Sequence, residues 1–218
     1  MKKQVIEAVE KEKIIVIVRG VEREKLIPLA KAMYDGGIRL IEVTFDASGK
    51  ISDSETAENI KMLSEYFDGK MTVGAGTVLS TEQVELVAKS GGKFIISPDT
   101  NADVIRKTVD LGLVSMPGAL TPTEIMTAHR SGADFVKLFP VSNLGSGYVK
   151  AVSAPISSVK FLAVGGIDLS NVKEYLKAGV WGFGIGSNIV DKVLLKNGDY
   201  KGITELAERY VSAVKEQV

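Results

Sequence analysis

The sequence contains no cysteine and a single histidine, His129. The absence of cysteine excludes disulfides, thiolate nucleophiles and thiolate metal sites, and it fits a reducing cytoplasm. One histidine leaves little material for a histidine-based metal cluster or for a serine–histidine catalytic triad. Any chemistry must therefore depend on other side chains.

Net charge and long apolar runs are lacking as well. Lys and Arg number 27 together, as do Asp and Glu, so the chain has no overall basic field of the kind that nucleic-acid-binding proteins use. No apolar run approaches the roughly 18 residues of a membrane span, and residues 1–13 are too charged for a signal-peptide core. We expect a soluble, cytoplasmic protein without a nucleic-acid or membrane partner.

What the sequence has instead is a regular alternation of short apolar runs and helix-like segments. Eight apolar runs are expected to form strands, at residues 14–19, 38–44, 71–76, 93–97, 112–118, 134–139, 160–166 and 181–187. Helical periodicity, with start signals such as Thr121-Pro122 and stops at glycine, predicts helices between them. These helices are expected up to about residue 11 and at residues 24–34, 54–66, 81–90, 101–111, 121–132 and 170–178.

Repeated strand–helix units imply right-handed crossovers and a parallel sheet. Eight units in 218 residues fit a compact (β/α)8 barrel, the TIM barrel of the α/β class, with an extra helix at the N-terminus. A doubly wound open sheet is the alternative, but GAG in MTVGAG does not continue as a dinucleotide fingerprint. Because no linker-like stretch interrupts the pattern, we expect one domain over residues 1–218, with residues 46–53 as its least regular loop.

Three charged residues interrupt the apolar strands near their carboxyl ends, where barrel enzymes place reactive groups. Arg19 ends the first expected strand, Glu42 lies near the end of the second, and Lys137 lies in FVKLFP of the sixth. A buried ammonium group is unfavourable unless it is paired or neutralised. Two structural explanations stay open: Lys137 extends its amine into water from a strand end, or it forms a buried salt bridge with Glu42.

Imine chemistry is the functional alternative. Desolvation lowers the pKa of a buried amine, so neutral Lys137 would attack a substrate carbonyl. Glu42 would then transfer the protons, and Arg19 offers a fork for a carboxylate.

Two glycine-containing motifs near the end of the chain suggest an anion site. VGGID begins at Val164 and GIGSN at Gly184, so each follows one of the last two expected strands. Phosphate sites in barrels are commonly built from these two loops and a following helix N-terminus. Close backbone approach would come from glycines and a donated hydroxyl from serine, at Gly165, Gly166, Gly186 and Ser187. The alternative is that both motifs are turns without a ligand.

The chain resembles a known family in motifs that cover nearly its whole length. In order, these are IVIVRG, GGIRLIEVTF, VGAGTVL, FIISPDT, MPGALTPTE, FVKLFP, VGGI and GIGSN. They resemble the 2-keto-3-deoxy-6-phosphogluconate (KDPG) and 4-hydroxy-2-oxoglutarate (KHG) aldolases, class I enzymes that cleave 2-keto-4-hydroxy acids to pyruvate and an aldehyde. The resemblance implies a barrel, a homotrimer, a small 2-keto acid substrate, and neither a metal nor an organic cofactor.

The same resemblance assigns roles to individual residues. It implies Lys137 as the Schiff-base lysine and Glu42 as the general acid/base. It implies a pyruvate pocket shaped by Thr77, Pro98 and Phe139, with Thr44 beside Glu42. It also implies that Gly165, Gly166, Gly186 and Ser187 hold a distal phosphate.

Two positions depart from the family pattern. Asp46 stands where many members carry an arginine, while others carry an arginine at the end of the first strand, as Arg19 does here. Val164 stands where a threonine is usual, which removes a hydroxyl from the pocket. These changes and the 46–53 loop leave the natural substrate open. Because this barrel hosts many functions, two rivals also stay open: a phosphosugar isomerase or epimerase, and a non-catalytic sugar-phosphate sensor, against which Lys137 and Glu42 argue.

Overall fold

A computed structural model of the chain describes residues 1–215, so the last three residues of the expected 1–218 domain lie outside the described part. The strands are β1 (Ile14–Val18), β2 (Leu40–Thr44), β3 (Thr72–Gly76), β4 (Phe94–Ile96), β5 (Val114–Met116), β6 (Gly118–Ala119), β7 (Val136–Leu138), β8 (Phe161–Val164) and β9 (Gly182–Ile185). The helices are α1 (Lys2–Glu12), α2 (Arg23–Asp35), α3 (Asp53–Tyr66), α4 (Thr81–Lys89), α5 (Ala102–Asp110), α6 (Pro122–Arg130), α7 (Gly145–Ser153), α8 (Val172–Lys177), α9 (Lys192–Asn197) and α10 (Tyr200–Lys215).

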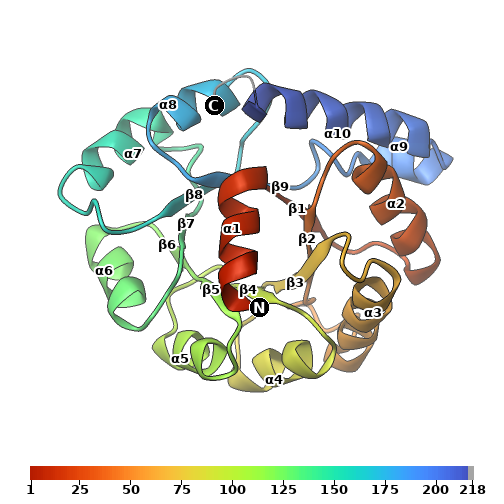
Figure 1. Cartoon of the computed structure of the whole chain (residues 1–218), viewed down its shortest axis with the longest axis horizontal. Coiled ribbons are helices and arrows are strands. Elements are labelled where there is room, and N and C mark those ends of the chain that lie inside the picture. Colours follow the sequence, from red (N-terminus) through yellow and green to blue (C-terminus); the bar gives the residue numbers. More distant parts are fainter. Residues whose placement is uncertain (216–218) are drawn as a thin grey trace.

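The strands form one parallel sheet in the order β5-β4-β3-β2-β1-β9-β8-β7-β6. Helices α2–α10 surround it as an outer ring, and α1 lies across its middle (Figure 1). β1 lies between β2 and β9, which joins the first and last strands of the chain. This arrangement confirms the expected (β/α)8 barrel with an additional N-terminal helix.

The expected fifth strand, residues 112–118, is divided into β5 and β6 at Pro117. Proline has no backbone N–H and breaks a hydrogen-bonded ladder. β5 pairs with β4, and β6 pairs with β7. The Pro117 carbonyl still accepts a hydrogen bond from the Lys137 amide at 2.9 Å, so the interrupted strand closes the ring between β4 and β7.

Seven expected helices correspond to α1–α6 and α8, with ends that differ by up to two residues. Three further helices, α7, α9 and α10, were not assigned from the sequence. The N-cap residue of α7 is Leu144, whose side chain forms no capping hydrogen bond, so this helix lacks a start signal. The other two had readable signals, because Asp191 caps α9 and α10 buries Ile203, Ala207 and Tyr210 at helical spacing.

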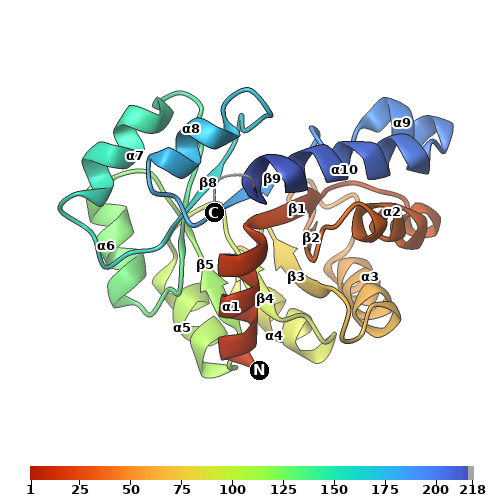
Figure 2. The same cartoon turned by 45° about the horizontal axis from the view of Figure 1, so that its top comes forward.

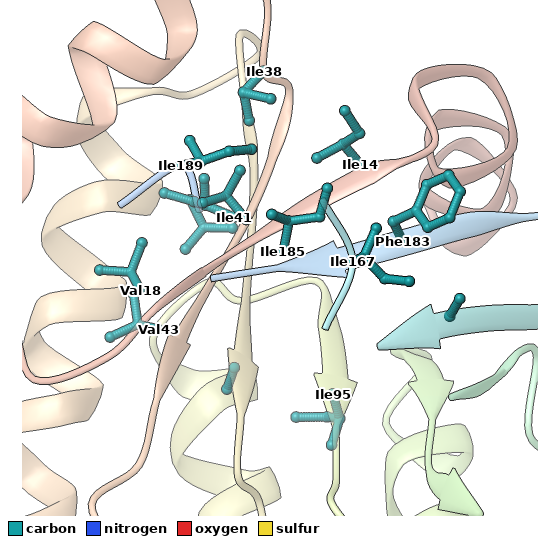
Figure 3. Close-up of a cluster of buried hydrophobic side chains, with 14 of the residues drawn as sticks. Ile14, Val18, Ile38, Ile41, Val43, Ile95, Ile167, Phe183, Ile185 and Ile189 are labelled. Carbon is teal, nitrogen blue, oxygen red and sulfur yellow. The ribbon is translucent and has the colours of Figure 1, made fainter. Parts of the chain in front are cut away.

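The main hydrophobic core lies between the strands and the ring of helices. Figure 3 shows part of it, including Ile14, Ile41 and Ile185 from three neighbouring strands. Ile14 and Val18 on β1 belong to this outer core. Val16 belongs to it too, whereas Ile15 between them belongs to the cluster inside the barrel, as the alternation of side chains along a strand requires. Arg19, Glu42 and Lys137 therefore follow the inward-facing positions of their strands.

A second, smaller cluster fills the inside of the barrel toward the amino-terminal ends of the strands. α1 lies across the middle of the ring of strands and contributes Val5 and Val9 to this cluster (Figures 1 and 2). The rest of the barrel interior leads to the mouth at the carboxyl ends of the strands. Within residues 1–215, no helix is long and apolar enough to cross a lipid bilayer.

Candidate active site

Glu42 and Lys137 are charged residues buried inside the barrel. Glu42 on β2 is 2% exposed and Lys137 on β7 is 7% exposed. On each strand the inward residue two positions earlier is apolar: Leu40 precedes Glu42 and Phe135 precedes Lys137. The pair therefore lies directly above an apolar layer, at the carboxyl-terminal end of the barrel.

Gly76 on β3 makes room for the Glu42 carboxylate. Thr44 of β2 pairs in register with Gly76. A Cβ atom at Gly76 would lie only 2.2 Å from Oε1 of Glu42, so any side chain there would displace the carboxyl group. The second glycine of the GAG motif, which does not form a dinucleotide-binding motif, thus leaves space for the Glu42 carboxyl group. Glycine inside a strand often occurs where another group approaches the backbone closely.

Burial sets the protonation of both groups. Desolvation raises the pKa of Glu42 from its ordinary 4.5 to about 7, although the positive charges of Lys137 and Arg19 act against this rise. Desolvation lowers the pKa of Lys137, with a further decrease from Arg19 and an opposing effect from Glu42. A carboxyl group that titrates near neutrality and an amine with increased neutral fraction match the needs of acid–base and nucleophilic catalysis.

The two groups do not form the direct salt bridge that the sequence left open. Among residues 1–215, no ion pair within 4.0 Å joins Glu42 to Lys137, and Oε2 of Glu42 is buried without a hydrogen-bond partner. Lys137 Nζ instead lies 4.6 Å from the centre of the Phe139 ring. Burial also rules out the other structural explanation, in which Lys137 extends its amine into bulk water. An unpaired buried carboxylate oxygen is unusual in a structural role.

Arg19 and Thr77 meet at the mouth from two different strands. Nη2 of Arg19, which is exposed, donates a hydrogen bond to Oγ1 of Thr77 at 3.1 Å. Thr77 directly follows β3 and has a positive φ of 56°, which is strained for a β-branched residue. Thr44 is buried beside Glu42, and its hydroxyl donates a 3.4 Å hydrogen bond to the Val18 carbonyl. The structure thus brings these residues together with the buried pair.

Phe139 lies against Lys137, and Pro98 lies against Gly118, the register neighbour of Lys137. Gly118 on β6 pairs in register with Lys137, and a Cβ atom at Gly118 would lie 2.3 Å from the Pro98 carbonyl oxygen. Phe139 follows Lys137 by two residues on the same face and is 37% exposed, so its ring is part of the rim of the mouth. Gly118 was not recognised as a site residue from the sequence, because its role depends on packing across strands.

The two glycine-containing loops lie next to each other and next to the mouth. Gly165 and Gly166 have positive φ values of 94° and 72°, which favour glycine. Gly165 packs 3.5 Å from Phe139 and Gly186 packs 3.6 Å from Ile17, counted from a Cβ placed on each glycine. Ser187 is exposed at the start of a turn. The expected helix N-terminus does not follow directly, since α8 and α9 begin several residues later.

Asn188 connects these loops, which the sequence did not indicate. Its Nδ2 donates a 2.8 Å hydrogen bond to the Ile167 carbonyl, so the loop after β9 is tied to the loop after β8. An asparagine beside a glycine motif gave a weak signal for this contact. Val164, the last residue of β8, is buried and presents no hydroxyl.

Asp46 turns back onto its own loop. Its carboxylate accepts hydrogen bonds from the amides of Ser48, Lys50 and Ile51 at 2.9, 3.0 and 3.1 Å. The Ser48 hydroxyl also donates to it at 2.7 Å. These bonds, with that of the Ser48 hydroxyl foremost, lower the pKa of Asp46 from 3.8 to about 2. Asp46 therefore organises the 46–51 turn and does not take the place of a carboxylate-binding arginine.

Comparison with known proteins agrees with this geometry. The family model described as KDPG and KHG aldolase matches residues 5–206. The chain belongs to this family. The 2-dehydro-3-deoxy-phosphogluconate aldolase of Treponema pallidum is 34% identical over 212 residues, which cover 96% of this chain and 97% of that protein.

Two further relatives extend this result. The 2-dehydro-3-deoxy-6-phosphogalactonate aldolase of Escherichia coli is 33% identical over 177 residues, covering 81% of this chain and 83% of that protein. The KDPG aldolase of Legionella pneumophila, crystallised with pyruvate captured at low pH as a covalent carbinolamine intermediate, superimposes with a TM-score of 0.83. It is 30% identical, and the match covers 93% of this chain and 96% of that one. This protein is thus an aldolase, a lyase that breaks carbon–carbon bonds, which decides against the isomerase and sensor alternatives.

Proposed function

We propose that this aldolase is a class I enzyme that cleaves a 2-keto-4-hydroxy acid through an imine on Lys137. The observation that carries the proposal is the buried pair of Lys137 and Glu42, which lie inside the barrel without a direct salt bridge. The neutral amine of Lys137 attacks the C2 ketone to give a carbinolamine. The carbinolamine hydroxyl takes the proton of the Glu42 carboxyl and leaves as water, which gives a protonated imine and the Glu42 carboxylate. Glu42 takes the proton of the C4 hydroxyl, directly or through a water, while the C3–C4 bond breaks and its electrons move toward the imine nitrogen.

The resulting enamine is then protonated at C3, and hydrolysis of the imine releases pyruvate and restores Lys137. A carboxyl group with a pKa of about 7 both accepts and returns protons near neutral pH, as these alternating steps require. The Phe139 ring, close to the amine, and Pro98, beside Gly118, shape the space for the methyl and keto groups.

Arg19 is the proposed partner of the substrate carboxylate. Its hydrogen bond to Thr77 orients the guanidinium at the mouth. Asp46 is negatively charged and accepts hydrogen bonds within its own loop, so it does not bind a carboxylate. The charge of Arg19 acts on both Glu42 and Lys137, and we therefore assign the carboxylate to Arg19. Thr44, two residues after Glu42 on β2, lies beside its carboxyl group.

The distal phosphate of the substrate is proposed to lie against the loops after β8 and β9. Gly165, Gly166 and Gly186 allow close backbone approach there, and exposed Ser187 offers a hydroxyl. The names of the relatives support phosphorylated six-carbon acids of either the gluconate or the galactonate series, which would yield glyceraldehyde 3-phosphate. The family description also supports 4-hydroxy-2-oxoglutarate, which would yield glyoxylate.

Mass spectrometry after incubation with pyruvate and borohydride tests the covalent step. The native protein should carry one reduced pyruvate adduct on Lys137, and Lys137→Ala should carry none. Lys150→Met, which removes an exposed lysine of α7, is the matched control and should keep the adduct. A native protein without an adduct, or an adduct on another lysine, would show that the imine mechanism is wrong.

Pyruvate release from the three candidate substrates then identifies the aldehyde half. A homotrimeric assembly, a cytoplasmic location and a single domain over residues 1–218 stay predictions. Native mass measurement, cell fractionation and limited proteolysis test them in turn.

A further inference from the structure

α1 covers the amino-terminal end of the barrel, opposite the mouth where the substrate is proposed to bind (Figures 1 and 2). Val5 and Val9 of this helix are 6% and 1% exposed. They form one buried cluster with inward side chains of the strands, namely Ile15, Leu40, Phe94, Ile96, Val114, Met116, Phe135 and Leu162. We call this cluster the barrel floor. α1 is the helix that contributes to this cluster, and the other members lie in the strands or, for Phe135, directly before β7.

The barrel floor lies directly under the catalytic pair. Phe135, the residue directly before β7, lies two positions before Lys137, and Leu40 lies two positions before Glu42 on β2. Each charged group therefore has an apolar floor residue immediately below it. Without α1, this layer would be the only barrier between the pair and water at the amino-terminal end.

Two ion pairs hold α1 against the strands next to Lys137. At one end Lys2 pairs with Asp134 at 3.0 Å, just before β7. At the other end Glu10 pairs with Lys160, just before β8. The Lys160 ammonium also lies 5.7 Å from the centre of the Phe135 ring in the floor. The helix is thus fixed to the start of β7, which carries Lys137, and to the start of the neighbouring β8.

None of the charges that act on Lys137 comes from α1, so we expect this helix to affect Lys137 through desolvation. The charges that act on Lys137 are those of Glu42 on β2 and Arg19 after β1. Its register neighbours on β6 and β8 are Gly118 and Leu162, which carry no charge. Below the floor, Lys2, Asp134, Glu10 and Lys160 are joined in the two ion pairs of α1, and Lys11, Glu12, Arg39 and Lys93 line a cavity beside this helix. None of these groups is among the charges that act on Lys137.

We infer that α1 is a positioning element of the active site, because it seals the barrel floor and so keeps the Lys137 amine dry and neutral for imine formation. This inference rests on the proposed function of Lys137. Burial is the largest cause of the lowered pKa of this lysine, so water that enters through a loosened floor would return its pKa toward the ordinary value. Val9 acts through the floor and does not touch the substrate.

The experiment compares variants of α1 by the pH dependence of Lys137 reactivity. Val9→Ala opens the floor, and Glu10→Gln releases one end of the helix without changing the cluster. Glu7→Gln is the matched control, because Glu7 forms only an exposed pair with Lys3 on the same helix. Acetylation of Lys137 by acetic anhydride, followed by mass spectrometry, is measured as a function of pH without pyruvate. Its midpoint is the pH at which Lys137 reacts at half of its maximal rate. Borohydride trapping with pyruvate is measured in parallel.

We expect the midpoint for Lys137 to move upward by about one pH unit in Val9→Ala and by less in Glu10→Gln. At a fixed pH below the midpoint, one unit means about tenfold slower trapping of pyruvate. Glu7→Gln should match the native protein. Should Val9→Ala fail to fold, the surface change Glu10→Gln decides the outcome.

An unchanged midpoint in a folded but less stable Val9→Ala protein would overturn the inference, since α1 would then contribute to stability alone. An equal shift in Glu7→Gln and Glu10→Gln would overturn it as well. If the midpoint responds to Val9 but the native protein forms no pyruvate adduct, the proposed function fails while the effect of α1 on Lys137 stands.

Discussion

Ionisable Glu42 lowers the free energy of unfolding at neutral pH. The stability gained by replacing it with glutamine, relative to the native protein, should therefore increase as the pH rises. Burial raises the pKa of Glu42 from 4.5 in the unfolded chain to about 7 in the fold. Below pH 4.5 both states hold the proton, and the group makes no difference to stability. Between the two pKa values the unfolded state loses its proton first, so stability falls as the pH rises, and above pH 7 the loss is complete.

The magnitude follows from the difference of about 2.5 pKa units. At roughly 1.4 kcal/mol per unit, ionisable Glu42 lowers the free energy of unfolding by about 3 kcal/mol at pH 8 and by about 1 kcal/mol at pH 5. Glutamine has nearly the same shape and does not titrate. Glu42→Gln should therefore gain about 2 kcal/mol relative to the native protein between these two pH values. Any effect of the unpaired amide is the same at both and cancels.

Urea unfolding of both proteins at pH 5 and pH 8 measures this gain. Glu205→Gln, at an exposed position on α10, is the control, and its difference from the native protein should change by less than about 0.5 kcal/mol. In the same samples Glu42→Gln should lose retro-aldol turnover by roughly 100-fold or more. A stability difference that is equal at pH 5 and pH 8 would refute the reasoning, because Glu42 would then ionise in the fold as easily as in water.

Two further changes test the geometry around the mouth. Gly76→Ala places a methyl group about 2.2 Å from Oε1 of Glu42, so the carboxyl group must move, and kcat should fall roughly 100-fold in a protein with native circular dichroism. Full activity in this variant would mean that the position of Glu42 is not critical. Asp46→Ala removes the acceptor of the 46–51 turn, so limited proteolysis should cut this loop while the urea midpoint changes little. A loop that resists the protease as before would contradict the role of Asp46.

The barrel could be predicted from the sequence because its strands and helices are local patterns. Apolar runs of a few residues, separated by helices that stop at glycine, describe each unit without knowledge of the others. The break at Pro117 was not predicted, since its effect depends on two neighbours, β4 and β7, that pair with different parts of one strand. Leu144 shows the opposite limit, because a helix that starts there without a cap depends on packing and has no local signal.

The residues of the site were recognisable because charge is rare in apolar strands. Arg19, Glu42 and Lys137 each stood out for this reason, and the structure gathers them at one end of the barrel. The sequence did not decide whether Glu42 and Lys137 touch, because their separation depends on the stagger of strands that lie far apart in the chain. Gly76 was equally hidden, since its importance comes from one contact across β2 and β3.

Closure of the sheet has a consequence for how the chain is made. β1 pairs with β9, and the Phe183 amide donates a 2.7 Å hydrogen bond to the Lys13 carbonyl, although these two residues are about 170 positions apart in the sequence. At roughly 5 to 20 residues per second, a ribosome needs about 10 to 30 s between these two strands. During that interval one edge of β1 has no partner, and an unpaired apolar edge is a template for other chains. A chain that ends before residue 182 therefore lacks β9 and leaves this edge of β1 unpaired.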